Sequence, residues 1–284
     1  MCFRFLFIRM SLPQNRKPLF GRQTLGKECL MTRLLITGAA GNIGTTLAPR
    51  LSALGYDLVL SDLHDNAARG IKGADLGNFD AICNVMQGVD GVIHLGGMAN
   101  EASFETVLNA NIRGTYHIFE AARRLGVPRI VLASSYHVVG LHPFGAPIDE
   151  TAPMLPDSFY GLSKAYGELL ARTYHDKCGI QSVSVRIGSC FDTVRSPRML
   201  TTWISADDLT RLVDRAFKVE TLGCLMVYGV SDNDRGCMVS SDADKLGWKA
   251  QDRSQDAPMD QGRESEIIGP LLGGPFAEAP LPQN

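Results

Sequence analysis

Apolar residues follow two alternating patterns along this chain from residue 32 onward. Short continuous apolar runs, rich in Val, Ile and Leu, are typical of buried strands, whereas the longer segments between them repeat apolar residues at helical spacing. Because strands and helices alternate, we expect an α/β fold with a doubly wound parallel sheet of the Rossmann type. The predicted strands are 33–37, 58–61, 92–95, 129–134, 182–187 and 224–228, with a further short strand ending at 74–76. The predicted helices are 42–54, 104–125, 160–177 and 206–218.

The 284 residues divide by composition into an N-terminal extension and one large domain. Residues 1–30 carry six basic residues and a single acid, and we interpret them as a mis-called start or a disordered extension, with Met31 as the natural first residue. A targeting segment is the alternative, which the short, arginine-interrupted apolar start does not favour. Residues 31–284 are expected to form a single domain, with a nucleotide-binding core over about 32–187 and a small, partly irregular substrate region over about 188–284.

Composition excludes several classes of function. The net charge of −2 gives no reason to expect a nucleic-acid partner. No apolar run approaches the roughly 20 residues that a membrane helix needs. The seven cysteines form no Cys-x-x-Cys pair, which indicates reduced thiols in a cytoplasmic compartment. The six histidines show no metal-binding spacing, so no metal site is expected.

A glycine-rich turn follows the first strand and opens the first helix. In this position glycines allow a tight turn and a close approach of a pyrophosphate to backbone N–H groups, and the start of the helix adds partial positive charge. The spacing is GxxGxxG, and we expect a dinucleotide to bind here. The residues of this turn that we assign to the cofactor are Gly38, Gly41, Asn42, Ile43 and Gly44.

An acidic residue at the end of the second strand predicts which dinucleotide binds. A carboxylate at Asp62 would accept hydrogen bonds from the adenosine ribose and repel a 2′-phosphate. The next residues are Leu63 and His64 rather than an arginine, so we predict NAD over NADP, with a solvated loop aspartate as the alternative. Asp75 and Leu76 are expected to frame the adenine, with Asp75 accepting from its exocyclic amine.

The end of the predicted strand 92–95 and the two glycines after it mark the approach to the substrate side. Leu95, Gly96 and Gly97 would let the cofactor lie against the backbone. His94 is interpreted as a core residue rather than a catalyst. Asn111, inside the predicted helix 104–125, is expected to hold a water molecule or a backbone group of a proton relay, or alternatively to pack on the sheet.

Tyr160 and Lys164 lie four residues apart on a predicted helix, so they share one face. We expect the Lys164 ammonium to lower the pKa of Tyr160 from its reference value of about 10 and so to create a base for neutral pH. Ser135 ends the strand before this helix and would hydrogen-bond the substrate oxygen while Tyr160 takes its proton. With NAD in place, these residues predict a dehydrogenase.

These motifs resemble the extended short-chain dehydrogenase/reductases, in the NAD-dependent epimerase/dehydratase family, and among them the uronate dehydrogenases. The resemblance extends over nearly all of the chain from Met31 to Phe276 and includes blocks that a general dinucleotide binder does not need. The blocks that carry it are 94–97, 133–135 with His137, 185–190, 198–203, 205–208 and 246–249.

The resemblance implies oxidation of C1 of D-glucuronate or D-galacturonate with NAD, to the aldarolactone, by a homo-oligomer. It also implies that Ser135, His137, Ser189 and Arg198 line the sugar site, with the anomeric hydroxyl directed at Tyr160. The planar fork of Arg198 suits the substrate carboxylate.

Two positions depart from the family pattern. Tyr136 replaces an asparagine that contacts the sugar, and Ala99 replaces a serine that also contacts the substrate. Both changes remove a polar partner, and each lost hydrogen bond can cost one to a few kcal/mol. The choice of sugar therefore stays open.

Three other functions stay open on the sequence alone. The chain could be another NAD-dependent sugar dehydrogenase of the same superfamily. It could be a nucleotide-sugar epimerase, although such enzymes usually need a larger C-terminal region. The third alternative is a non-catalytic NAD-binding sensor, against which the retained Tyr160, Lys164 and Ser135 argue.

Overall fold

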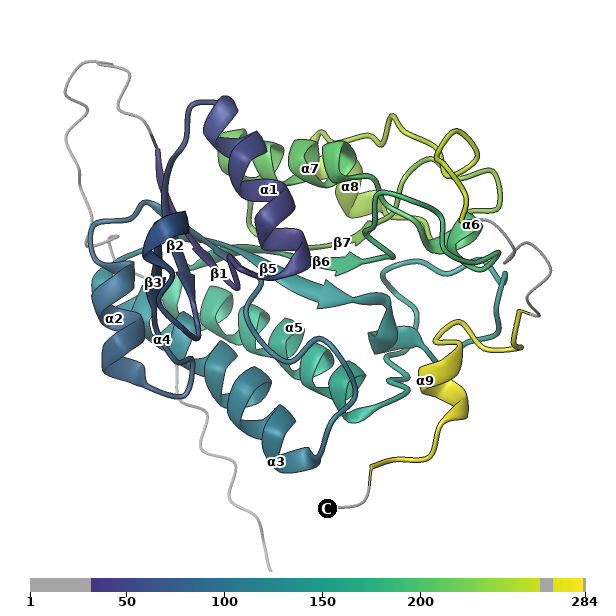
Figure 1. The fold of residues 1–284 in the computed structure, drawn as a ribbon, viewed down its shortest axis with the longest axis horizontal. Helices are drawn as coiled ribbons and strands as arrows, with labels where there is room; N and C mark the ends of the chain where they lie inside the picture. Colours follow the sequence, from purple (N-terminus) through teal and green to yellow (C-terminus); the bar gives the residue numbers. More distant parts are fainter. Residues whose placement is uncertain (1–31, 261–267, 283–284) are drawn as a thin grey trace, which may run out of the picture. The chain divides into compact units, whose positions relative to one another are not determined.

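The computed structural model describes residues 32–260 and 268–282, so the interpretation of residues 1–30 lies outside the described residues. Within these ranges seven strands pair in parallel in one sheet, in the order β3-β2-β1-β4-β5-β6-β7 (Figure 1). The strands are β1 (Arg33–Thr37), β2 (Asp57–Asp62), β3 (Ile71–Gly73), β4 (Gly91–His94), β5 (Arg129–Ser135), β6 (Gln181–Ile187) and β7 (Cys224–Gly229).

Helices cover both faces of the sheet, as the alternating pattern predicts. Helices α1 (Asn42–Ala53) and α7 (Ala206–Lys218) lie on one face, and α2 (Phe79–Met86), α4 (Gly114–Leu125) and α5 (Phe159–Cys178) lie on the other (Figure 1). Each face has its own apolar core, because the strands contribute side chains alternately to the two sides. The shorter helices are α3 (Phe104–Val107), α6 (Met199–Thr202), α8 (Ser241–Leu246) and α9 (Pro275–Glu278). Single turns lie at Ala67–Arg69 and Tyr136–Val139, and a π-helical segment spans Leu108–Arg113.

The predicted doubly wound sheet is confirmed, and most predicted boundaries agree with the structure to within one residue. The short strand predicted to end at 74–76 is wrong in its position, because β3 already ends at Gly73. Helix α2 was not predicted, although Ile82, Val85 and Met86 are buried at helical spacing after an Asn78 cap. The pattern was therefore present, but the segment is only about two turns long.

The order of the strands decides where a ligand can bind. From β1 the chain builds outward through β2 and β3, and it then returns to place β4 on the other side of β1. In a doubly wound sheet the crevice at such a reversal, at the carboxyl ends of the strands, is where ligands bind. Within the described ranges, no helix combines the length and the apolar character that crossing a membrane requires.

Candidate active site

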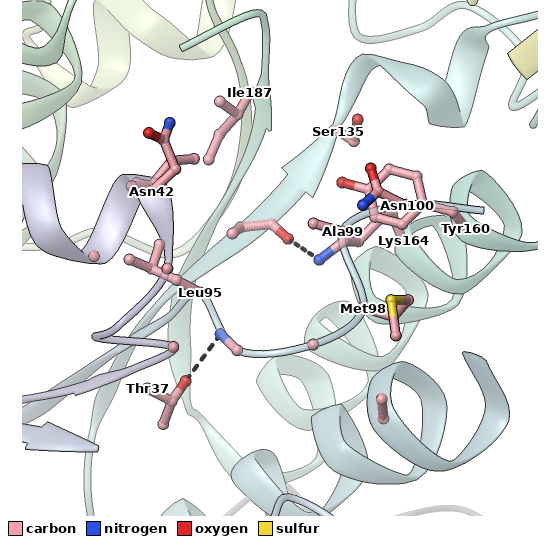
Figure 2. A pocket seen from close by; sticks show the side chains of 18 of the residues that line it. Thr37, Asn42, Leu95, Met98, Ala99, Asn100, Ser135, Tyr160, Lys164 and Ile187 are labelled. Carbon is pink, nitrogen blue, oxygen red and sulfur yellow. Dashed lines mark hydrogen bonds between the residues drawn. The ribbon is translucent and has the colours of Figure 1, made fainter. Parts of the chain in front are cut away.

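A cavity of about 730 Å³ lies where the carboxyl ends of β1, β4, β5 and β6 meet. All of the predicted cofactor and substrate residues line this cavity except Asn111 and Arg198. Figure 2 shows Asn42 on one side of it and Tyr160 and Lys164 on the other. The sheet thus brings together the glycine turn and the predicted catalytic residues, which lie far apart in the sequence.

The glycines of the first turn have different roles. Gly38 has a φ of +71°, and a Cβ there would lie 2.7 Å from the backbone nitrogen of Gly96. A Cβ on Gly44 would overlap the carbonyl oxygen of Gly38. Gly41 lines the cavity, and a Cβ there would meet only the Gly38 oxygen, at 3.3 Å. Gly38 and Gly44 are therefore required by backbone packing, whereas Gly41 leaves space for a ligand.

The first turn of α1 is suited to bind an anion. Its N-cap, Gly41, forms no side-chain hydrogen bond, and the turn contains no acidic residue. Unpaired N–H groups and the partial positive charge of the helix end fit a pyrophosphate. The side-chain amide of Asn42 instead donates to the Cys190 carbonyl at 2.9 Å and ties the turn to the segment after β6. The residues present therefore fit the predicted dinucleotide.

Asp62, the last residue of β2, is held at the cavity by backbone groups. Its two carboxylate oxygens accept from the N–H groups of Ala40 and Leu63, both at 2.7 Å. Carboxylate oxygens have further lone pairs, so Asp62 can still accept from ribose hydroxyls. Arg69 donates to the Ala39 carbonyl at 3.5 Å and does not line the cavity. This part of the cavity therefore presents a negative charge, as a preference for NAD requires.

Asp75 and Leu76 form the adjoining wall, directly after β3. An oxygen of Asp75 accepts from the Gly77 N–H at 2.8 Å, which closes a tight turn. The Leu76 carbonyl accepts a hydrogen bond from His117 Nδ1 at 2.7 Å. The Leu76 side chain packs so closely on α4 that a Cβ at Gly114 would lie 2.8 Å from it.

Asn111 binds the backbone of the loop after β4 and does not line the cavity. Its Oδ1 accepts from the Met98 N–H at 2.7 Å, and its Nδ2 donates to the Met98 carbonyl at 3.0 Å and to Ser163 Oγ at 2.9 Å. Both amide hydrogens are used, so Asn111 has none left for a water molecule. Among the roles that we considered for Asn111, the structure shows the contact with a backbone group. The π-helical segment that carries Asn111 is typical of functional sites.

Glu101 is a residue that sequence reasoning missed. Its carboxylate oxygens accept from the N–H groups of Phe159 and Tyr160 at 3.0 and 2.9 Å. Ser158 caps the same helix by accepting from the Gly161 N–H at 3.0 Å. Glu101 therefore fixes the start of α5, including the backbone of Tyr160 itself. Ser158 could be recognised as a helix cap from sequence, whereas a contact over 58 residues could not.

Tyr160 and Lys164 lie on α5 and face the cavity together with Ser135, at the end of β5. The Lys164 ammonium lies 5.5 Å from the centre of the Tyr160 ring. It donates to the carbonyl of Ala133 at 2.9 Å, an interaction that Figure 2 marks. The predicted juxtaposition of the three side chains is therefore present, and Lys164 is anchored to β5.

The pKa values of the pair differ from our expectation. Burial, only partly offset by the hydrogen bond of the Ser135 hydroxyl and aided by charges on Tyr136 and Asp157, raises the pKa of Tyr160 to about 12. Burial lowers the pKa of Lys164 to about 8. The expected lowering of the Tyr160 pKa by Lys164 is therefore wrong, because removal of both groups from water disfavours phenolate and ammonium alike.

His137 is held between two aromatic rings at the substrate end of the cavity. Its ring stacks on Tyr136 and on Phe276, with a distance of 4.5 Å between ring centres in each case. Its Nδ1 lies 2.7 Å from an oxygen of the buried Asp157. Sequence reasoning missed Asp157 and Phe276, which come from a loop and from the C-terminal helix α9.

Arg198 binds Tyr136 rather than lining the cavity itself. Its guanidinium donates to the carbonyl of Leu272 at 2.7 Å and to the hydroxyl of Tyr136 at 2.9 Å, and it does not line the cavity. Tyr136 is longer than the asparagine that the resemblance implies, so its hydroxyl reaches the guanidinium. In this structure Arg198 therefore reaches the cavity wall only through Tyr136, and its contact with the sugar carboxylate stays a prediction.

Ser189 and Ala99 line the cavity as predicted. Ser189 Oγ lies 2.9 Å from Thr202 Oγ1, and this contact fixes its hydroxyl. Ala99 offers no polar group, but the next residue, Asn100, also lines the cavity and was missed. The amide of Asn100 adds a polar group beside the position where a serine would be expected.

His94 is a core residue, as predicted. It is buried on β4 between Thr37 and Thr115, with ring nitrogens 2.8 and 3.3 Å from their hydroxyl oxygens. Burial, aided by the charge of Lys164, lowers the pKa of His94 to about 3. It is therefore neutral at physiological pH. In the described part of the chain, no cluster of three or more His, Cys, Asp or Glu side chains could hold a metal ion.

A family model described as the NAD dependent epimerase/dehydratase family matches residues 34–218. This chain belongs to the NAD dependent epimerase/dehydratase family. The match covers the sheet up to β6 and helix α7, and therefore includes the glycine turn, Asp62, Tyr160 and Lys164. Membership of the family confirms the predicted resemblance and the predicted cofactor, NAD.

Within the family, the chain is similar to uronate dehydrogenases. It is 45% identical to the uronate dehydrogenase of Pseudomonas syringae pv. tomato over 78% of this chain and 83% of the relative. A structure of glucuronic acid dehydrogenase from Chromohalobacter salexigens matches with a TM-score of 0.82 and 41% identity, over 89% of this chain and 99% of the other. A uronate dehydrogenase variant from Agrobacterium tumefaciens complexed with NAD matches with a TM-score of 0.82 and 38% identity, over 89% and 100% of the two chains.

Proposed function

We propose that this protein oxidises C1 of a hexuronic acid, D-glucuronate or D-galacturonate, to the aldarolactone with NAD as the hydride acceptor. The observation that carries the proposal is the 45% identity to a uronate dehydrogenase, together with the meeting of Tyr160, Lys164 and Ser135 in one cavity. The identity favours this reaction over that of a nucleotide-sugar epimerase. We further propose that the enzyme is cytoplasmic and forms a homo-oligomer.

The cofactor residues would hold NAD along the cavity. The first turn of α1 would bind the pyrophosphate, Asp62 the adenosine ribose, and Asp75 with Leu76 the adenine. When bound, NAD supplies the acceptor for the hydride that leaves C1. Lys164, anchored on the Ala133 carbonyl, would also bind the nicotinamide ribose.

Tyr160 would take the proton of the C1 hydroxyl, and Ser135 would orient that hydroxyl by a hydrogen bond. Tyr160 must be phenolate before it can accept this proton, and because burial raises its pKa to about 12, the phenolate needs stabilising partners. The Ser135 hydroxyl and the Lys164 ammonium are the two groups placed to do this. By stabilising phenolate, they raise the fraction of enzyme in which Tyr160 can accept the C1 proton.

A screen for NADH formation tests the proposal. Purified protein would be offered D-glucuronate, D-galacturonate, the neutral aldoses glucose and galactose, and UDP-glucose, each with NAD. We expect absorbance at the NADH wavelength to rise with one or both uronates. If the protein oxidised a neutral aldose or UDP-glucose but neither uronate, the proposed uronate dehydrogenase activity would be overturned.

We expect Asp62→Ala to weaken the preference for NAD. Loss of hydrogen bonds to the ribose should raise KM for NAD by about tenfold, and the NAD/NADP ratio of kcat/KM should fall further because the repelling charge is gone. Initial rates at varied cofactor concentration measure both values. Asp57→Ala, at the opposite end of the same strand, is the matched control. An unchanged ratio would show that Asp62 does not select the cofactor.

We expect Arg198→Ala to raise KM for the uronate by about tenfold, with KM for NAD unchanged. Because Arg198 bonds the Tyr136 hydroxyl at the cavity wall, its effect should act through Tyr136. Tyr136→Phe should then have a similar effect, and the double variant should be no worse than either single variant. Additive losses would instead indicate a direct contact of Arg198 with the substrate.

A further inference from the structure

His137 and Asp157 form a buried pair beside the cavity. His137 Nδ1 lies 2.7 Å from Asp157 Oδ2, and the Asp157 side chain has no exposed surface. The other oxygen, Oδ1, lies 2.7 Å from Ser158 Oγ. Ser158 Oγ accepts from the Gly161 N–H, so its own hydrogen is free for Asp157. Oδ1 therefore accepts from Ser158, which leaves Oδ2 to face Nδ1 of His137 alone.

The neighbouring aromatic rings prevent the His137 ring from flipping about its χ2 angle. Tyr136 and Phe276 stack on its two faces at 4.5 Å, with interplanar angles of 29° and 26°. Asp157 holds the Nδ1 edge, and His137 lines the cavity, so the Nε2 edge is the one left for a ligand. Among the described residues, no side chain or backbone group bonds Nε2. Nε2 is thus the ring nitrogen that remains available to a ligand in the cavity.

The space for the Asp157 carboxylate is made by glycines from three separate segments. A Cβ on Gly140 or on Gly273 would overlap Asp157 Oδ2, and a Cβ on Gly161 would lie 3.1 Å from Oδ1. Gly273 belongs to the C-terminal segment that also supplies Phe276. The chain therefore surrounds the carboxylate closely from three sides, which fixes its position relative to His137.

From this geometry we infer that Asp157 is a positioning residue: it fixes His137 as the Nδ1–H tautomer, so that Nε2 accepts a hydrogen bond from a hydroxyl group of the sugar substrate. This inference rests on the proposed function for the identity of the sugar. It implies that the site selects a sugar with a free hydroxyl group on the carbon that faces Nε2 of His137. A deoxy or O-methyl derivative at that carbon has no hydrogen to donate to Nε2 and is bound less well.

Nitrogen NMR of the full chain tests the pair directly. With ¹⁵N-labelled histidine, the His137 resonances are assigned by their loss in His137→Gln. We expect a protonated Nδ1 and an unprotonated Nε2 in the wild-type protein, and a perturbed Nε2 resonance when the uronate is added with NADH. Protonation of Nε2, alone or together with Nδ1, would overturn the inference without reference to any variant.

Kinetics of Asp157→Asn provide the second test. The asparagine keeps the volume of the carboxylate, but its amide can donate as well as accept and no longer fixes the tautomer. We expect KM for the uronate to rise by about 10- to 100-fold, by analogy with groups that orient histidine ligands, with the dissociation constant of NAD unchanged. Asp80→Asn, at an exposed position of α2, should behave as wild type.

A double variant separates positioning from a purely structural role. In the His137→Gln background, Asp157→Asn should have little further effect on KM, because the group that Asp157 orients is gone. An equal loss in both backgrounds, or a wild-type KM in Asp157→Asn, would overturn the inference. If the wild-type protein oxidises neither uronate, the proposed function fails, while the NMR measurement still decides the tautomer.

Discussion

Tyr160→Phe is expected to lower kcat by about 10³-fold while the protein still binds NAD. The substitution removes only the oxygen that would take the C1 proton. The ring remains in contact with His137 and Phe276, with ring centres 5.7 and 6.2 Å away, so the walls of the cavity should persist. Loss of activity would then report on proton transfer rather than on folding.

The measurement combines steady-state oxidation of the uronate with a titration of NAD by calorimetry. Tyr166→Phe is the matched control, because Tyr166 lies on the same helix but does not line the cavity. It should retain wild-type kcat. A kcat for Tyr160→Phe within tenfold of wild type would mean that another group accepts the proton.

Glu168→Ala is expected to lower the free energy of unfolding by about 3–5 kcal/mol. Glu168 lies on α5 and binds Arg186 of β6 by two hydrogen bonds, of 2.9 and 2.8 Å, and it accepts a third from Ser134 at 2.5 Å. Arg186 is 1% exposed, so removal of Glu168 leaves a buried guanidinium without its charge partner. Breaking such a pair costs far more than breaking an exposed one.

Urea unfolding followed by circular dichroism measures this effect, with one variant as the control. Asp176→Ala removes the partner of Arg172 on the same helix, where both side chains are about half exposed or more. That variant should change the free energy of unfolding by less than about 1 kcal/mol. Similar stabilities for Glu168→Ala and Asp176→Ala would show that the buried pair does not stabilise the fold.

The same network also connects stability to the site. Glu168 and Tyr160 share α5, and Ser134 directly precedes Ser135 on β5. Through Ser134 and Arg186, Glu168 therefore holds α5, which carries Tyr160 and Lys164, against β6 and against β5, which ends in Ser135. A loss of order in this network would displace Tyr160 relative to Ser135, so Glu168→Ala should also lower activity.

Much of the cofactor site could be predicted because its residues act through local geometry. The Gly38 turn lies directly between a strand and a helix, and Asp62 ends the next strand. Tyr160 and Lys164 are one helical turn apart. In each case the spacing along the chain already fixes the relative positions of the groups, and the parallel sheet places all strand ends at one edge.

The substrate end could not be predicted in the same way. The contact of Glu101 with the Tyr160 N–H spans 59 residues, and the bond between Arg198 and Tyr136 spans 62. No periodicity or spacing encodes such pairs. The resemblance suggested that Arg198 faces the sugar, but in this chain the longer Tyr136 side chain takes up the guanidinium.

The sequence by itself determined the doubly wound sheet and NAD as the cofactor, and it proposed Tyr160, Lys164 and Ser135 for catalysis, because strand and helix periods and turn glycines are local properties of the chain. Only the tertiary structure decided the pKa values of the Tyr160 and Lys164 side chains and the orientation of the His137 ring. Burial raises the pKa of Tyr160 to about 12 and lowers that of Lys164 to about 8, contrary to the expectation from their spacing. The pairing of His137 with Asp157 likewise depends on loops that packing brings together, since solvent exclusion and long-range contacts arise only when the chain is folded.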